Sequence, residues 1–333
     1  MAIIDQLQAL PQQWKAMLED RFQPLIEQVR LIATRAKNPL ESSYQHGCEL
    51  LNSGQFKEAK MRFKFVLWRK PSHAKSWYQL ALAHFSLQEK YEGIKALNKS
   101  LAFNTNDEEA LYLKATIEGG KYADQYSPHT TPIRMVKAEF AERADGYNHH
   151  EFERNYIGHL LISRAMMNIP YMERIILDAG CGAGMGAPTL RPFAKKLIGV
   201  DISPHMIAEA RAFPMQFYDE FIEVDIRDHL LRTKPNQYDA ITSSNVIPII
   251  GGLAPVMDGV ANALTHEGYF IFNCYALQAM EGYQFINEMG RFSHSKNYIK
   301  QQAGRANLEV ISITEEKLYE DDTRTAYVVT LKK

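Results

Sequence analysis

The hydrophobic positions change their period along the chain, and the change predicts two different kinds of domain. Up to about residue 118, apolar side chains recur every three or four positions, which is the spacing of one helical face. After about residue 174, short aliphatic runs alternate with helical patterns and turn residues. The chain therefore predicts an α-helical part followed by an α/β domain with a mostly parallel sheet.

Residues 1–39 are predicted to be the first helical stretch. Pro11 and Pro24 are expected to divide it into pieces, because proline interrupts the hydrogen bonds of a helix interior. Acidic residues interrupt its polar face, so we interpret it as an amphipathic helix packed on the next domain rather than as a membrane anchor. Its apolar positions recur at three- and four-residue steps: Trp14, Met17, Leu18, Phe22, Leu25, Val29 and Ile32.

A pattern of about 34 residues then occurs twice, and it resembles the tetratricopeptide repeat, a pair of antiparallel helices. Residues 108–117 resemble the first helix of a third unit, as expected of a capping helix. We therefore predict that residues 40–125 hold two repeats and a cap. The first unit carries Gly47, Leu50, Gly54, Phe56, Ala59, Phe63, Val66 and Pro71, and the second carries Trp77, Leu80, Ala81, Phe85, Tyr91, Ile94, Leu97 and Leu101.

The resemblance to these repeats implies binding of a peptide or another protein on a concave face. Two repeats offer only a small groove, so packing on the following α/β domain or on a second copy of the chain is an equal alternative. Residues 126–134 contain only turn and extended residues and predict a linker. The catalytic domain is expected to occupy residues 135–333.

A glycine-rich turn follows the first strand of that domain. Asp178 marks the end of an aliphatic strand, and Gly180, Gly182 and Gly184 allow positive φ values and a close approach of a ligand to the backbone. A helix follows the turn. This arrangement predicts a nucleotide site.

The spacing of the turn decides between two nucleotides. A dinucleotide loop reads G-x-G-x-x-G/A, which this loop fits weakly. Asp178, Gly180, Gly182 and Gly184 instead spell acidic-x-G-x-G-x-G, which resembles the first motif of the class I S-adenosylmethionine-dependent methyltransferases. The resemblance implies that the loop backbone, Cys181 included, binds the methionine and ribose portions of S-adenosyl-L-methionine. It also implies that Asp178 holds the amino group side.

Further acids end the next two strands. Asp201 follows the strand about twenty residues after the loop, where a carboxylate can accept both ribose hydroxyls. The resemblance implies that Ile202 and Met206 flank the adenosine, and that Asp225 and Ile226 recognise and cover adenine.

The fourth strand, residues 238–245, ends in small polar residues that include Ser243. The resemblance puts them under the methyl group. Residues 308–313 and 325–331 predict an antiparallel hairpin similar to the one that closes class I methyltransferase domains. The predicted fold is thus a tetratricopeptide-repeat domain followed by a doubly wound, Rossmann-like α/β methyltransferase domain with a C-terminal hairpin. Nearly the whole chain resembles bacterial predicted methyltransferases with N-terminal repeats.

Three residues are candidates for the acceptor side. Tyr147 follows a helix that resembles the one preceding the first strand in many small-molecule methyltransferases, and it is expected either to close over the cofactor or to fix the helix to the sheet. Residues 290–294 are expected to form a loop over the methyl side. There Arg291 would clamp an anionic part of the acceptor, and His294 would position or deprotonate the acceptor. The alternative is that both are solvated loop residues.

The composition of the chain limits the classes of partner that it is expected to bind. A formal net charge of -1 gives no general attraction to nucleic acid or to an anionic membrane. The three cysteines lack metal-ligand spacing, and the run from His149 to Glu151 has no evident third ligand, so no metal is expected. No apolar run approaches the roughly 20 residues of a membrane span, and a cytoplasmic protein is predicted.

We therefore expect a methyltransferase that moves a methyl group from S-adenosyl-L-methionine to an acceptor by in-line displacement. The acceptor atom and the choice between a small molecule and a protein stay open. The alternative from another class is a non-catalytic adaptor that binds proteins through its repeats and keeps a cofactor-binding fold.

Overall fold

The structure is a computed structural model that describes residues 38–118, 130–170, 172–286, 290–320 and 324–333. The predicted N-terminal segment, residues 1–39, lies almost wholly outside these ranges. The chain divides into two compact units, Met1–Ala110 and Leu111–Lys333. No helix in the described ranges is both long enough and apolar enough to cross a membrane.

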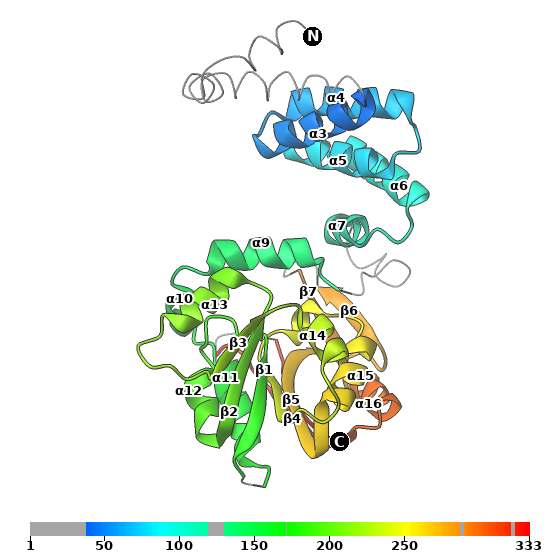
Figure 1. The fold of residues 1–333 in the computed structure, drawn as a ribbon. Helices are drawn as coiled ribbons and strands as arrows, with labels where there is room; N and C mark the ends of the chain where they lie inside the picture. The colour runs from blue at the N-terminus through cyan, green and yellow to red at the C-terminus, as the bar shows by residue number, and fades with distance from the viewer. Residues whose placement is uncertain (1–37, 119–129, 171, 287–289, 321–323) are drawn as a thin grey trace, which may run out of the picture. The chain divides into compact units, whose positions relative to one another are not determined.

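The first unit is helical, and its consecutive helices pack on one another (Figure 1). Gly47 allows the first two helices to approach closely, because a Cβ there would lie 2.7 Å from the ring of Phe63. Gly93 and the ring of Phe85 meet in the same way in the next pair. The helices are α3 (Pro39–Asn52), α4 (Phe56–Arg69), α5 (Ala74–Ser86) and α6 (Lys90–Phe103), followed by α7 (Glu108–Glu118), in which the division between the units falls.

The second unit is built on a nine-stranded mixed sheet with the order β3-β2-β1-β4-β5-β7-β6 and with β9 and β8 continuing from β5. Five strands pair parallel with one another: β1 (Arg174–Ala179), β2 (Ala194–Asp201), β3 (Glu220–Glu223), β4 (Tyr238–Ser243) and β5 (Leu264–Leu277). The end of β5 also pairs parallel with β7, and β5 pairs antiparallel with β9. The remaining strands are β6 (Tyr283–Ile286), β7 (Arg291–Ser295), β8 (Glu309–Glu316) and β9 (Ala326–Lys332). The predicted C-terminal hairpin is β8 and β9, which pair antiparallel.

Helices cover both faces of this sheet, as the aliphatic strand patterns require (Figure 1). One apolar cluster joins the sheet to α14 (Ile226–Arg232), α15 (Ala254–Ala263) and α16 (Lys296–Arg305). A second cluster joins it to α11 (Gly158–Met167) and α12 (Ala187–Leu190). The other helices are α9 (Ile133–Arg143), α10 (Tyr147–Glu153), α13 (Pro204–Arg211) and two short 3₁₀ helices, η1 (Arg191–Phe193) and η2 (Ile247–Ile249).

Two stretches differ from their predicted form. The expected loop at residues 290–294 is mostly strand β7, which pairs with β6 and with the end of β5. Part of the predicted linker also belongs to the second unit, because the Thr131 amide donates to the Ile249 carbonyl at 2.9 Å and α9 begins at Ile133.

Candidate functional site

The glycine turn after β1 has the backbone geometry that its sequence predicts. Gly180, Gly182 and Gly184 have φ values of 83°, 52° and 80°. A Cβ on Gly180 would overlap the Val246 side chain. Glycine at position 180 therefore allows the loop to take a positive φ and to pass close to Val246.

Asp201 fixes this loop to the end of β2. One carboxylate oxygen accepts a hydrogen bond from the Gly182 amide at 2.8 Å, and the other accepts one from the Ser203 amide at 2.8 Å. Burial raises the pKa of Asp201, while these amide donors favour its charged form. The carboxylate keeps lone pairs for ligand hydroxyls.

Asp178 lies at the end of β1 beneath the same loop. Its oxygens accept hydrogen bonds from the Tyr218 hydroxyl at 2.6 Å and the Thr242 hydroxyl at 3.3 Å. Burial raises the pKa of Asp178 to about 6, although both hydroxyls act in the opposite direction. A cationic ligand group beside this carboxylate would lower its pKa again.

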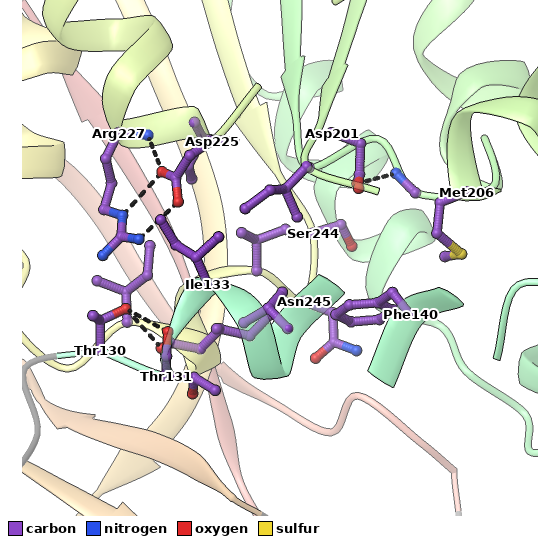
Figure 2. A pocket seen from close by; sticks show the side chains of 18 of the residues that line it. Thr130, Thr131, Ile133, Phe140, Asp201, Met206, Asp225, Arg227, Ser244 and Asn245 are labelled. Atoms are coloured by element: carbon purple, nitrogen blue, oxygen red, sulfur yellow. Dashed lines mark hydrogen bonds and ion pairs between the residues drawn. The ribbon is translucent and has the colours of Figure 1, made fainter. Parts of the chain in front are cut away.

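Asp225 caps α14 and is paired with Arg227. It accepts hydrogen bonds from the Arg227 amide, Nε and Nη2 at 2.8, 2.9 and 2.7 Å. Burial alone would raise the pKa of Asp225, but the arginine lowers it overall. The two side chains form one end wall of a cavity (Figure 2).

That cavity lies at the carboxyl ends of the parallel strands, under α9, and we call it the α9 cavity. It contains about 700 Å³ of empty space, including the part open to solvent. Figure 2 shows Asp201 and Met206 on one side and Thr130, Thr131 and Ile133 on another. Its lining includes eight of the predicted site residues: Tyr147, Gly180, Gly182, Asp201, Ile202, Met206, Asp225 and Ile226.

A second cavity of about 540 Å³ adjoins the first, and we call it the Asp178 cavity. It is lined by the predicted residues Asp178 and Cys181 and, among others, by Tyr156 and His159. The Nδ1 atom of His159 is shielded from solvent and has no hydrogen-bond partner among the described residues. Burial lowers the pKa of His159, so the ring is neutral at pH 7. Both cavities share five residues, Tyr147, Gly180, Gly182, Ser244 and Asn245.

Two predicted cofactor residues do not line either cavity. Ser243 is fully buried, and its hydroxyl donates to the Ala179 carbonyl at 2.9 Å. Side chains alternate along a strand, so its neighbour Ser244 lies on the cavity side. Gly184 packs its backbone on Ala210 instead.

Helices α9 and α10 cover the loop and bring Tyr147 to both cavities. The Asn148 side chain donates to the Ala183 carbonyl at 2.8 Å, which ties α10 to the glycine loop. Arg143 joins the two helices, because it donates to Glu139 on α9 and to Glu151 on α10 at 3.1 and 2.8 Å. Glu151 is buried and accepts a further hydrogen bond from Tyr319 at 2.9 Å.

Arg291 and His294 lie outside both cavities. Arg291 forms an ion pair with Glu139 on α9. His294 is fully buried in β7, and its Nε2 donates to the Gly251 carbonyl at 3.1 Å. Burial lowers the pKa of His294 to about 4. The geometry thus gives no support to a direct contact between these two residues and an acceptor.

Several lining residues escaped the sequence prediction. His159 and Arg227 carry no motif, and Phe140 was assigned only to the helix that precedes Tyr147. Arg227 lies two residues after Asp225, a predicted site residue that proves to be the N-cap of α14. Within the described ranges, no group of three or more His, Cys, Asp or Glu side chains could hold a metal ion.

Comparison with known proteins finds a similarity within the α/β domain. Residues 177–272 match the model of the methyltransferase domain family. A 104-residue stretch is 27% identical to a ubiquinone biosynthesis O-methyltransferase of Xylella fastidiosa (strain 9a5c), covering 30% of this chain and 41% of that protein. The chain thus spans about two fifths of the length of that relative.

Two solved methyltransferase structures are similar to part of this chain, at TM-scores below 0.5. One is an S-adenosylmethionine-dependent methyltransferase of Mesorhizobium loti, at 19% identity and a TM-score of 0.43, covering 51% of this chain and 95% of the other. Another is the 1,6-didemethyltoxoflavin-N1-methyltransferase of Burkholderia thailandensis, solved with S-adenosylhomocysteine, at 11% identity and a TM-score of 0.48 over 60% and 88% of the two chains. Over residues 177–272 the α/β domain is thus similar to methyltransferase domains.

Proposed function

We propose that the chain transfers the methyl group of S-adenosylmethionine to an unidentified acceptor, with the cofactor lying across both cavities. One observation carries this proposal. The two cavities adjoin beside the glycine loop and share five lining residues. A nucleoside joined to an amino acid is a long ligand with two unlike ends. Two adjoining cavities with different linings suit such a ligand.

The α9 cavity is suited to the nucleoside end. In this proposal, Asp201 accepts the ribose hydroxyls, and Ile202 and Met206 contact the adenosine. Ile226 covers the adenine ring. Asp225 forms an ion pair with Arg227. The polar edge of adenine would therefore contact this ion pair rather than an isolated carboxylate.

The Asp178 cavity is suited to the amino-acid end. Asp178 offers a carboxylate to the amino group, and the Gly180–Gly182 backbone lies between the two ends. His159 lines the same cavity, and its buried Nδ1 has no hydrogen-bond partner in the described part of the chain. A buried polar atom left without a hydrogen bond costs about 1–3 kcal/mol. A bond from this atom to the amino-acid end would remove that cost.

The bound cofactor supplies a sulfonium that leaves as a neutral thioether, so the protein has little chemical activation to provide. Alignment of the reacting atoms is then the main contribution, worth up to about 7 to 11 kcal/mol in favourable cases. Tyr147, Ser244 and Asn245 lie where the cavities meet and would align the acceptor. In this proposal Arg291 and His294 support the site indirectly. Arg291 forms an ion pair with Glu139, and His294 donates a hydrogen bond to the Gly251 carbonyl.

The helices of the first unit support the proposal that residues 40–118 contain tetratricopeptide repeats. Small residues meet aromatic rings within both successive helix pairs, at Gly47 with Phe63 and at Gly93 with Phe85. We propose that this unit recruits a partner or a substrate, or joins two copies of the chain.

Calorimetry and isotope transfer test the enzyme proposal separately. S-adenosylhomocysteine is expected to bind and to raise the melting temperature, whereas NAD is not. Preferential binding of NAD would contradict the proposal. Labelled methyl groups should then pass from the cofactor to a component of cell extract. Binding without any transfer would favour the adaptor.

A further inference from the structure

A buried asparagine joins several groups at the place where the two cavities meet. Asn273 lies on β5 and is completely buried. Its Oδ1 accepts a hydrogen bond from the Asn245 amide at 2.8 Å. Its Nδ2 donates to the Gly158 carbonyl at 3.4 Å and to the Ser244 hydroxyl oxygen at 3.3 Å. A backbone amide only donates and a backbone carbonyl only accepts, so these two neighbours fix the orientation of the Asn273 side chain.

The Ser244 hydroxyl has a second partner in Tyr156. The two hydroxyl oxygens lie 2.7 Å apart. Gly158 leaves room for this contact, because a Cβ there would lie 2.1 Å from the Tyr156 hydroxyl oxygen. Burial raises the pKa of Tyr156 well above its usual value, so the phenol keeps its proton. Ser244 is therefore held by Asn273 and by a protonated tyrosine.

The direction of these hydrogen bonds follows from the chemistry of the two hydroxyls. A phenol is a stronger acid than an alcohol and its oxygen is a weaker acceptor, so Tyr156 donates to Ser244. The Ser244 oxygen then accepts from both Tyr156 and Asn273, which uses its two lone pairs. These bonds leave the Ser244 proton available to a bound molecule.

Ser244 lies at the junction of the cavities. It lines both the α9 cavity and the Asp178 cavity, whereas Tyr156 lines only the second. Figure 2 shows Ser244 among the side chains of the α9 cavity. In the proposed function the nucleoside lies in one cavity and the amino acid in the other, so the sulfur between them lies at the junction. The Ser244 hydroxyl would then lie beside the methyl group that is transferred.

We propose that Ser244 donates a hydrogen bond to the attacking atom of the acceptor, and that this atom is an oxygen. The inference rests on the proposed function and names the atom that it left open. A hydroxyl oxygen has two lone pairs, so it can accept from Ser244 with one and attack the methyl carbon with the other. A neutral amine nitrogen has one lone pair, which the same hydrogen bond would occupy. Tyr156 is a positioning residue, because it acts through Ser244.

The bond changes are those of a displacement at carbon. The acceptor oxygen forms a bond to the methyl carbon while the carbon–sulfur bond breaks and its electron pair stays on sulfur. The hydroxyl proton of the acceptor passes to solvent. Hydrogen bonds to an ionised oxygen are roughly twice as strong as those to a neutral one, so Ser244 favours the loss of this proton.

A binding measurement tests the donor in the absence of an acceptor. S-adenosylhomocysteine sulfoxide carries an oxygen on sulfur in place of the methyl group, and this oxygen can accept from Ser244. Ser244→Ala should weaken binding of the sulfoxide about fivefold, the effect of one neutral hydrogen bond, and leave the affinity for S-adenosylhomocysteine unchanged. Tyr156→Phe should weaken the sulfoxide by a smaller factor. It should add nothing to Ser244→Ala, because its effect passes through Ser244.

Ser163→Ala is the matched control for these variants. The Ser163 hydroxyl is also buried, but it donates to the Thr189 carbonyl at 3.3 Å, and Ser163 lines neither cavity. Calorimetry should therefore find both affinities unchanged. In Ser244→Ala, an equal loss for the two ligands, or no loss for either, would overturn the proposal. A parent that does not bind S-adenosylhomocysteine would contradict the proposed function itself.

The labelled product tests the identity of the attacking atom. Hot hydriodic acid releases methyl groups bound to oxygen as methyl iodide, and at the same temperature it leaves those bound to nitrogen in place. Labelled methyl iodide is expected from the product that the parent forms in cell extract, and Ser244→Ala should form this product at least about tenfold more slowly. Label that stays behind would overturn the assignment to oxygen. A parent that binds S-adenosylhomocysteine but transfers no label would contradict the transfer and, with it, the acceptor.

Discussion

The hydroxyl of Tyr218 donates a hydrogen bond of 2.6 Å to Asp178, a residue 40 positions earlier in the chain. Both residues are buried, and Asp178 has a pKa of about 6 because burial disfavours its charged form. Tyr218 opposes this shift, since its hydrogen bond stabilises the carboxylate. The tyrosine therefore helps to keep the acid charged at the pH where it would meet the amino group of the cofactor.

The first prediction is a pH dependence of cofactor binding. The ligand's ammonium group binds the charged carboxylate, so S-adenosylhomocysteine should bind most tightly above pH 6 and more weakly as Asp178 is protonated below it. In Tyr218→Phe the carboxylate loses a donor, its pKa rises, and the midpoint of the affinity loss should move to higher pH. Calorimetry between pH 5 and 8 measures both midpoints.

Tyr238→Phe is a matched control. The Tyr238 hydroxyl lies 2.8 Å from His229 Nε2, and neither residue lines either cavity. Equal midpoints in the parent and in Tyr218→Phe would count against a role for Asp178.

The second prediction concerns Asp201. Replacing it with alanine removes the acceptor of the Gly182 and Ser203 amides as well as the proposed acceptor of the ribose hydroxyls. Asp201→Ala should weaken S-adenosylhomocysteine binding by about 1.5 to 3 kcal/mol, the range for a hydrogen bond to a charged group. Asp201→Asn keeps the shape and one acceptor oxygen and should lose less. Parental affinity in Asp201→Ala, measured by calorimetry, would remove Asp201 from the site.

The positions of the parallel strands along the chain, and the acids that follow them, could be predicted from the sequence. Aliphatic runs fix where the buried strands lie, and the acids at Asp178, Asp201 and Asp225 lie at or just beyond the ends of three of them. Parallel strands end at the same edge of the sheet. These residues can therefore be expected to lie close together there, even when no tertiary contact is known. The glycine turn was equally predictable, because its three positive φ values require that residue.

The remaining features depend on partners that are distant in sequence. A loop was predicted for residues 290–294, yet residues 291–295 form the largely buried strand β7. Burial is possible because Ser293 donates to the Gln284 carbonyl and His294 to the Gly251 carbonyl. The pairing of Arg291 with Glu139, 152 positions away, likewise has no local signal.

The third prediction uses the close approach of Gly180 to Val246. A methyl group at residue 180 would overlap Val246 and would also force a non-glycine residue to a φ of 83°, a conformation that costs roughly 1–2 kcal/mol. Gly180→Ala should therefore weaken S-adenosylhomocysteine binding at least about tenfold, equal to 1.4 kcal/mol. Adding Val246→Ala should restore part of the loss, because it removes the overlap and leaves the strain.

The matched control for that pair is Gly54→Ala in the first unit. Gly54 also has a positive φ, of 78°, but nothing lies within 4 Å of an added methyl group. This change should cost stability without changing binding. If Gly180→Ala binds like the parent, the loop does not approach the ligand as proposed.

The last prediction assigns the Asp178 cavity to the amino-acid end of the cofactor. The unpartnered Nδ1 of His159 can donate to a carboxylate in one tautomer and accept from an amino group in the other. His159→Ala should therefore weaken S-adenosylhomocysteine binding by about 1.5 to 3 kcal/mol. It should leave the affinity for 5′-methylthioadenosine within about 0.5 kcal/mol, because that compound keeps the nucleoside and the sulfur but lacks the amino-acid chain. His205→Ala, at an exposed position on α13, is the control and should change neither affinity. Calorimetry with the two ligands separates the outcomes. An equal loss of affinity for both ligands would mean that His159 only supports the fold of the site. Unchanged affinity for both ligands would mean that its buried nitrogen does not bind the cofactor and is available to the acceptor.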